Sequence, residues 1–175
     1  GLSMPAGFVN WKELLRPIAE GIELDVDRED DLATLAQFYL NKNGNNRGEL
    51  TQVILEKFGK NARTTENHEI LARLPIETYW TTNYDKLIET SLENASRVPD
   101  VKFTVEHLAQ TGPNRNAVIY KMHGDISLPH KVILTRNDYE SYHILYQPFI
   151  TALSGDLVDK TFLFIGFSFS DPNLE

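Results

Sequence analysis

Two short polar motifs in this chain carry side chains that could do chemistry. Asn83 and Asp85 stand two residues apart within Thr81–Asp85, and an amide and a carboxylate at that spacing can both reach one ligand. The amide could hold a hydroxyl or orient a water, and the carboxylate could accept a hydrogen bond from a hydroxyl. His123 precedes Gly124 in the second motif; histidine titrates near neutrality and can take a proton from a hydroxyl or a water. The residue types therefore indicate general-base chemistry.

Two glycine-containing segments could supply contacts to a phosphorylated ligand. Gly1 and Ser3 open a stretch of small residues that includes Ala6, and such a turn lets the backbone approach a pyrophosphate near the N-terminus of the next helix. In the stretch Gly166–Ser168, the glycine permits close approach and the serine hydroxyl can bond a phosphate or sugar oxygen. Plainer interpretations stay open: an ordinary loop for the first segment, a core strand and turn for the second, and a helix cap for Asp85.

The order of apolar runs predicts the scaffold that would bring these side chains together. Strands are expected at 76–81, 101–105, 117–122, 132–134 and 161–165. Helices are expected at 11–20, 32–39, 50–58, 66–74, 85–95 and 139–157, the last interrupted by Pro148. This alternation favours an α/β fold with a Rossmann-like, doubly wound parallel sheet and an inserted helical module at about 11–74. Because parallel strands end at one edge, their polar residues should converge on one crevice.

The acidic run Glu23–Asp31 admits two interpretations. Asp25, Asp27 and Asp31 offer oxygen ligands for a metal, but acidic side chains also favour the N-terminus of the helix that follows. The second interpretation needs no bound ion and is the one we favour. The absence of cysteine excludes disulfides and thiolate metal sites. We therefore expect no metal site.

Bulk composition narrows the function further. The 175 residues suit a single domain, and we interpret them as a fragment of a longer protein, truncated at both ends. The net charge of −8, from 25 acidic and 17 basic residues, argues against a broad nucleic-acid surface. No apolar stretch is long enough to span a bilayer. Together with the lack of cysteine, this favours a cytoplasmic protein with no membrane partner.

The ordered motifs resemble the SIR2 (sirtuin) family, in the branch called SIR2-like. Residues Thr81–Asp85 resemble the family's Thr-Gln-Asn-x-Asp, with Thr82 in place of glutamine. His123 matches the catalytic His-Gly, and Gly166–Ser168 resembles Gly-Thr-Ser, with Phe167 in the threonine position. The chain departs from sirtuins at Val9–Trp11, where they have an acidic-aromatic-basic tripeptide. It also lacks the four cysteines of the sirtuin zinc module, so no zinc is expected.

The amino-acid sequences of the motifs are most similar to those of bacterial SIR2-like NADases of antiphage defence. The resemblance implies an NAD⁺ glycohydrolase that cleaves NAD to nicotinamide and ADP-ribose, with Asn83 and His123 as catalytic residues. The residues implied in NAD binding are Gly1, Ser3, Ala6, Thr82, Asn83, Asp85, Gly166, Phe167 and Ser168. It also implies a homo-oligomer and a partner ATPase or sensor protein. The alternatives are a non-catalytic NAD or ADP-ribose sensor and, less favoured, an NAD-dependent protein deacylase.

Overall fold

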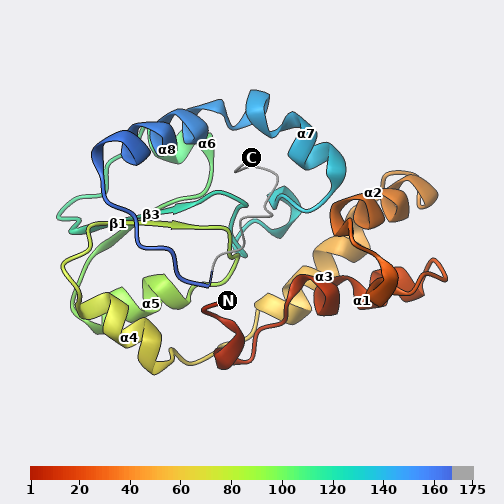
Figure 1. The fold of residues 1–175 in the computed structure, drawn as a ribbon, viewed down its shortest axis with the longest axis horizontal. Helices are drawn as coiled ribbons and strands as arrows, with labels where there is room; N and C mark the ends of the chain where they lie inside the picture. The colour runs from red at the N-terminus through yellow and green to blue at the C-terminus, as the bar shows by residue number, and fades with distance from the viewer. Residues whose placement is uncertain (167–175) are drawn as a thin grey trace.

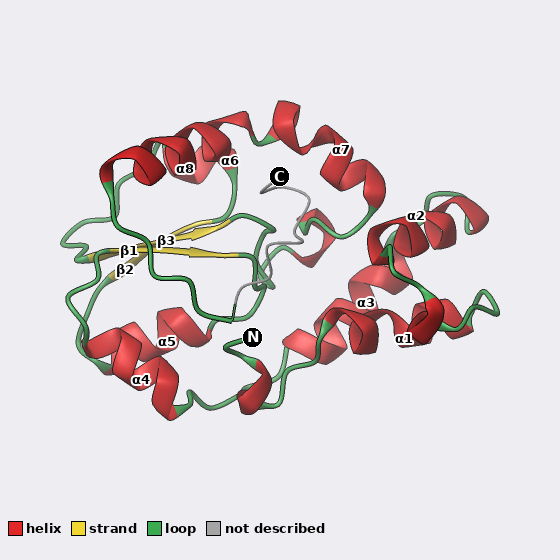
Figure 2. Ribbon diagram, viewed as in Figure 1, coloured by secondary structure: helices red, strands yellow, loops and turns green. Residues whose placement is uncertain are grey.

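The computed structural model describes residues 1–166 and contains a parallel sheet between two layers of helices (Figure 1). The sheet has three strands in the order β1-β3-β2, with bounds Thr78–Thr81 for β1, Pro99–Lys102 for β2 and Ala117–Lys121 for β3. Helices α4 (Glu66–Arg73) and α5 (Leu87–Asn94) cover one face, and α6 (Val105–Leu108) and α8 (Gln147–Asp159) cover the other (Figure 2). The predicted Rossmann-like α/β class is confirmed.

Alternating side chains of the strands pack into different layers, as the period of a strand requires. Ala117 and Ile119 of β3 are buried against Leu92 of α5. On the opposite face, the indole Nε1 of Trp80 donates to an Asp156 carboxylate oxygen of α8 at 2.8 Å. Both faces of the sheet are therefore covered, and only its strand ends are available for a site.

A helical module precedes the sheet and has its own hydrophobic core. It consists of α1 (Trp11–Glu20), α2 (Leu32–Lys42) and α3 (Gly48–Phe58). In α1, Leu14, Leu15 and Ile18 lie on one face and are fully buried, as their spacing predicts. The same core includes Tyr84 and Val132 from the loops that follow β1 and β3. The module is thus joined to the sheet at the ends of two strands (Figure 1).

The remaining elements complete the described chain. Short 3₁₀ turns lie at Met4–Ala6, Val26–Arg28 and Pro129–Lys131. Helix α7 (Arg136–Leu145) begins with a capping box formed by Thr135 and Asp138, and Pro148 stands in the first turn of α8. The predicted interruption of one long helix at Pro148 is therefore confirmed. Within residues 1–166, none of the helices has the length and apolar character that crossing a bilayer would require.

Two strand predictions were wrong and a third was displaced. Residues 161–165 belong to no strand, and Leu163 is 68% exposed. An apolar run shows a preference for burial, whereas a strand also needs backbone hydrogen bonds to a neighbouring strand, and hydrophobicity does not specify that pairing. Residues 132–134 are buried but irregular: Ile133 N donates to His123 O at 2.9 Å instead of joining a ladder. Strand β2 begins two residues before the start of the predicted 101–105 and ends three residues before its end.

Candidate functional site

The ends of β1 and β3 bring the two polar motifs side by side. The strands are parallel neighbours with Thr81 opposite Lys121. The pairing extends one step further, since Met122 N donates to Thr81 O at 2.9 Å. Beyond it, Ile126 N donates to Tyr84 O at 3.0 Å, which joins the two loops directly. The loops carrying Asn83 and His123 therefore leave the sheet at one place, as the convergence of parallel strand ends predicts.

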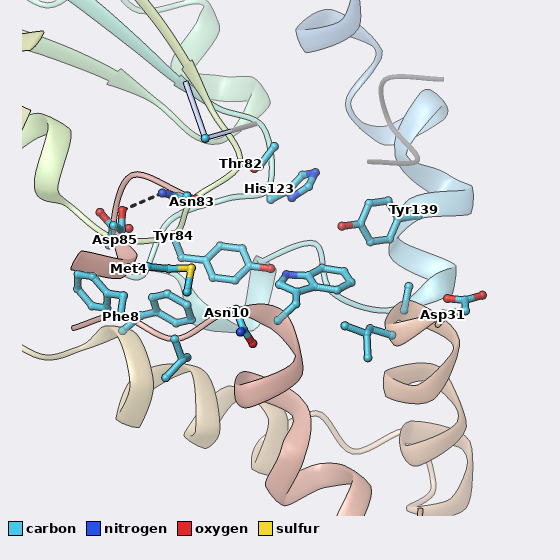
Figure 3. Close-up of a pocket in the computed structure, with 18 of the residues that line it drawn as sticks. Met4, Phe8, Asn10, Asp31, Thr82, Asn83, Tyr84, Asp85, His123 and Tyr139 are labelled. Atoms are coloured by element: carbon cyan, nitrogen blue, oxygen red, sulfur yellow. Dashed lines mark hydrogen bonds between the residues drawn. The ribbon is translucent and has the colours of Figure 1, made fainter. Parts of the chain in front are cut away.

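A cavity of about 640 Å³ lies at these loops, between the sheet and the helical module (Figure 3). This size is within the range of about 300–1,000 Å³ typical of small-molecule sites. Seven residues singled out from the sequence line it: Gly1, Ser3, Thr82, Asn83, Asp85, His123 and Gly166. Ala6 does not line the cavity, and Phe167 and Ser168 lie outside the described residues. Four segments distant in sequence thus meet at one cavity.

Asn83 is oriented by the glycine-rich segment at the start of the chain. Its side-chain Nδ2 donates to the Ser3 hydroxyl at 2.9 Å (Figure 3). Its backbone N–H donates to the Thr81 hydroxyl at 3.1 Å. With Nδ2 committed to Ser3, the amide is held in one orientation at the cavity wall.

His123 lies on the loop that follows β3, with its ring against Tyr139 of α7. The two ring centroids are 5.4 Å apart and nearly perpendicular, and both residues line the cavity (Figure 3). The backbone that presents the ring is fixed by the bond from Ile133 N to His123 O. It is also fixed by Gly124, which has a φ of +91°, a conformation that only glycine adopts readily. The histidine is therefore placed by its backbone as well as by its ring contact.

Asp85 combines a local structural bond with an oxygen that has no partner. Its Oδ1 accepts from Leu87 N at 3.0 Å, at the start of α5. Its Oδ2 is buried and makes no hydrogen bond among the described residues. A buried carboxylate oxygen without a donor is unfavourable, and this oxygen has almost no exposed surface that a ligand could contact. The bond that the structure shows for Asp85 is therefore the one that supports the start of α5.

Two glycines from opposite ends of the described chain touch at the cavity. A Cβ on Gly1 would lie 2.7 Å from Gly166 O, and a Cβ on Gly166 would lie 2.8 Å from Gly1 Cα. Neither distance is compatible with a side chain. Gly166 also has a φ of +58°, so glycine is required there for conformation as well as for space. This close contact lets main-chain groups form the cavity wall.

Aromatic side chains form much of the remaining wall, and sequence reasoning missed them. Trp11 and Tyr139 meet edge to face with centroids 6.1 Å apart, and Phe8 stacks on Phe58 at 5.4 Å. The other lining residues that were missed are Met4, Val9, Asn10, Asp30, Leu32, Ala33 and Tyr84. Asn10 and Trp11 could have been suspected because they directly follow the glycine-rich segment. Tyr139 carries no comparable signal, since it comes from a helix far along the chain.

Asp31 resolves the alternatives for the acidic run. Its two carboxylate oxygens accept from the hydroxyl of Thr34 at 2.6 Å and from the backbone N–H of Thr34 at 2.9 Å. These bonds hold the pKa of the Asp31 carboxyl below its usual value. The carboxylate is therefore the N-cap of α2, as the helix interpretation predicts. Across residues 1–166, His, Asp and Glu nowhere gather in a group of three or more that could hold a metal ion.

Comparison with known proteins agrees with this architecture. Residues 77–175, more than half of the chain, match the SIR2-like domain. The chain belongs to the SIR2-like family. Its full length is 58% identical to a protein named NAD(+) hydrolase ThsA from Bacillus cereus (strain MSX-D12) and 58% identical to one of the same name from Acinetobacter baumannii (strain 532279). A third protein of that name, from Enterococcus faecium, is 54% identical.

The chain spans only 37%, 36% and 37% of the length of these three proteins, respectively. The SIR2-like match covers β1 to β3 and the loops that carry Asn83 and His123. It begins after the helical module. The ThsA proteins, in contrast, are similar to the module and the sheet alike.

Proposed function

We propose that this chain is the NAD-hydrolysing part of a longer protein and that it releases nicotinamide from NAD. The observation that carries the proposal is the meeting of Asn83, His123 and the Gly1–Gly166 contact at one cavity. The SIR2-like family and the names of the ThsA relatives support it.

The residues of the cavity have separate roles in this reaction. We propose that the diphosphate is bound at the Gly1–Gly166 contact, where backbone N–H groups can approach it closely. The first turn of α1 faces the same cavity through Asn10 and Trp11, and the positive end of the helix dipole favours an anion there. Asp85 lines the cavity beside Asn83, and we assign it to NAD binding because it belongs to the same motif as Asn83.

Asn83 and His123 act at the reacting carbon. The bond between the ribose C1′ and the nicotinamide nitrogen breaks, and its electron pair stays on nicotinamide, which leaves neutral. A water held by Asn83 adds its oxygen to C1′, and His123 takes the proton that this water loses. The products are nicotinamide and ADP-ribose, with one proton released. Thr82 and Ser3 line the cavity beside Asn83 and complete the contacts to the nucleotide.

The wider biology of the protein belongs to the same proposal. We place it in the cytoplasm, as an NADase that depletes the cofactor in antiphage defence. It would act as a homo-oligomer, together with a partner ATPase or sensor. These assignments rest on the motifs of the SIR2-like resemblance.

The test is nicotinamide release by the full-length protein, compared with the variants His123→Ala and Asn83→Ala. A positioned base contributes about 10²–10⁴-fold, so His123→Ala should lose at least about 10²-fold under conditions where the variant is still folded. His130→Ala is the matched control, because His130 is exposed and does not line the cavity; it should keep full activity.

Three results would contradict the proposal. NAD binding without nicotinamide release would favour the sensor alternative. Acyl-ADP-ribose formed from an acyl-lysine peptide would indicate a deacylase. Near-normal turnover in both His123→Ala and Asn83→Ala would remove these residues from the reaction.

A further inference from the structure

A lysine stands at a position of β3 that its strand pattern reserves for an apolar residue. Ala117, Ile119 and Lys121 are the buried positions of the strand, and they share one face of the sheet. The Lys121 side chain is 0% exposed. Burying an ammonium group is costly unless charges and hydrogen bonds compensate for it. The contacts of Lys121 therefore have to explain its presence.

The Lys121 ammonium group is surrounded by four acceptors from three segments. Its Nζ lies 2.9 Å from Oε1 of Glu89 in α5 and forms a very short ion pair with Asp125. It also donates to two main-chain carbonyls, Tyr84 O at 3.1 Å and Asp85 O. An ammonium group has three N–H donors, so every donor has an acceptor and one is shared. The group is fully satisfied inside the protein.

Three of these acceptors belong to the two loops that form the candidate site. Tyr84 O and Asp85 O lie on the loop that carries Asn83, and Asp125 lies two residues after His123. Lys121 thus bonds to both loops, and it does not line the cavity itself.

The Asp125 side chain transmits this contact to the His123 loop. One of its oxygens binds Lys121, and the other accepts from Ser127 N at 2.7 Å. Burial alone would raise the pKa of the Asp125 carboxyl, but Lys121 and Ser127 outweigh it and lower the pKa. The carboxylate therefore stays ionised and bonded on both sides, which fixes the turn that follows His123.

We propose that Lys121 is a positioning residue, which sets the distance between Asn83 and His123 by bonding both of their loops at once. The proposal rests on the proposed function, because it assigns both loops to one reaction. A misplacement of about 1 Å can cost about 10²-fold in rate. The role of Lys121 is thus geometric, and it acts without touching NAD.

Lys121→Met in the full-length protein tests the role, with Lys102→Met as the matched control. Lys102 is also a buried lysine at the end of a strand, paired with Asp100 and bonded to Gln110 O, but it contacts neither loop of the site. We expect kcat for nicotinamide release to fall by about 10²-fold in Lys121→Met, with KM changed by only a few-fold. Lys102→Met should keep the wild-type kcat although it too loses a buried ion pair.

A second variant reduces the cost of unpaired charge by removing one of the two carboxylates that Lys121 pairs with. Lys121→Met alone leaves Glu89 and Asp125 without their cation, and the protein could fail to fold for that reason. Combining it with Glu89→Gln removes one positive and one negative charge, so the net charge of the cluster stays the same. A folded double variant with a low kcat supports the proposal. A folded double variant with wild-type kcat overturns it, because the bonds from Lys121 to the loops would then be dispensable.

Amide hydrogen exchange gives a measure that does not depend on catalysis. Exchange in segments 82–86 and 122–128 should accelerate in the double variant but not in Lys102→Met, because Lys121 no longer joins the loops. Unchanged exchange there overturns the positioning role even if activity is lost. If the wild-type protein releases no nicotinamide, the proposed function fails, and the exchange result alone decides whether Lys121 holds the loops together.

Discussion

Replacing Gly124 by alanine perturbs the turn that presents His123, and its cost can be worked out from the geometry. The φ of +91° costs a residue with a Cβ about 1–2 kcal/mol. The added Cβ would also lie 3.2 Å from the Cα of Val132. Val132 cannot retreat easily, since its carbonyl accepts from Arg47 at 2.9 Å and Ile133 N is bonded to His123 O. Overpacking of this kind adds about 1–3 kcal/mol.

Two further glycines separate these contributions experimentally. Gly7 has the same φ of +91° but open space around its Cβ position, so Gly7→Ala should cost the conformational part alone. Gly155 is exposed within α8 and also has open space, so Gly155→Ala should stabilise the protein by about 1 kcal/mol. The free energy of unfolding should therefore decrease in the order Gly155→Ala, wild type, Gly7→Ala and Gly124→Ala.

The assay is denaturant or thermal unfolding of the three variants, together with nicotinamide release. A loss of about 3 kcal/mol corresponds to about 6–12 °C in Tm for a domain of this size. Gly124→Ala should also lose activity at temperatures where it is folded, because the turn moves the histidine. If Gly124→Ala is as stable as Gly7→Ala, the contact with Val132 has no energetic weight and the reasoning fails.

Two other predictions concern ion pairs away from the reacting groups. Arg47→Met removes the half-buried ion pair with Asp138, which is 2.8 Å long and joins the helical module to α7. The free energy of unfolding measured in urea should fall by about 1–3 kcal/mol. An unchanged urea midpoint would contradict this prediction. Burial alone would raise the pKa of the Asp100 carboxyl. The bonds from Lys102 and Arg115 outweigh this effect, so that the pKa is lower than its usual value. Its stabilising contribution is therefore present above the unfolded pKa of about 3.9 and is lost as the pH falls through the lower folded value. Asp100→Asn should reduce Tm at pH 7 and have little effect near pH 2; an equal effect at both would refute this assignment.

Much of the fold could be predicted because its elements carry strong local signals. Helix α1 has both an N-cap, Asn10, and a stripe of leucine and isoleucine, and its predicted bounds were correct. The run 161–165 carries only hydrophobicity, which does not specify pairing with a neighbouring strand. Residues 132–134 are buried, as predicted, but they form no strand. Their backbone groups bond to Arg47, Tyr84 and the His123 loop instead of to a neighbouring strand.

In the candidate site, too, some contacts could be predicted from the sequence and others could not. Asn83 and His123 were brought together by a rule of topology, since both directly follow parallel strands that proved to be neighbours. The pairing of Asn83 with Ser3, 80 residues away, and the facing of His123 and Tyr139 depend on tertiary packing. No spacing within the sequence encodes these contacts. Lys121 was likewise counted as an ordinary member of a strand, although a charge within an apolar run was a visible signal.

The division of the cavity between two hydrophobic cores has a consequence for how such proteins can diverge. The groups assigned to the reaction come from loops on the sheet side, whereas Phe8, Trp11 and Phe58 come from the segment before it. Substitutions at Phe8, Trp11 or Phe58 can reshape what the cavity accepts without removing the bond from Asn83 to Ser3. Selection for the fit of a ligand and selection for the rate of its conversion can therefore act on different residues of the cavity.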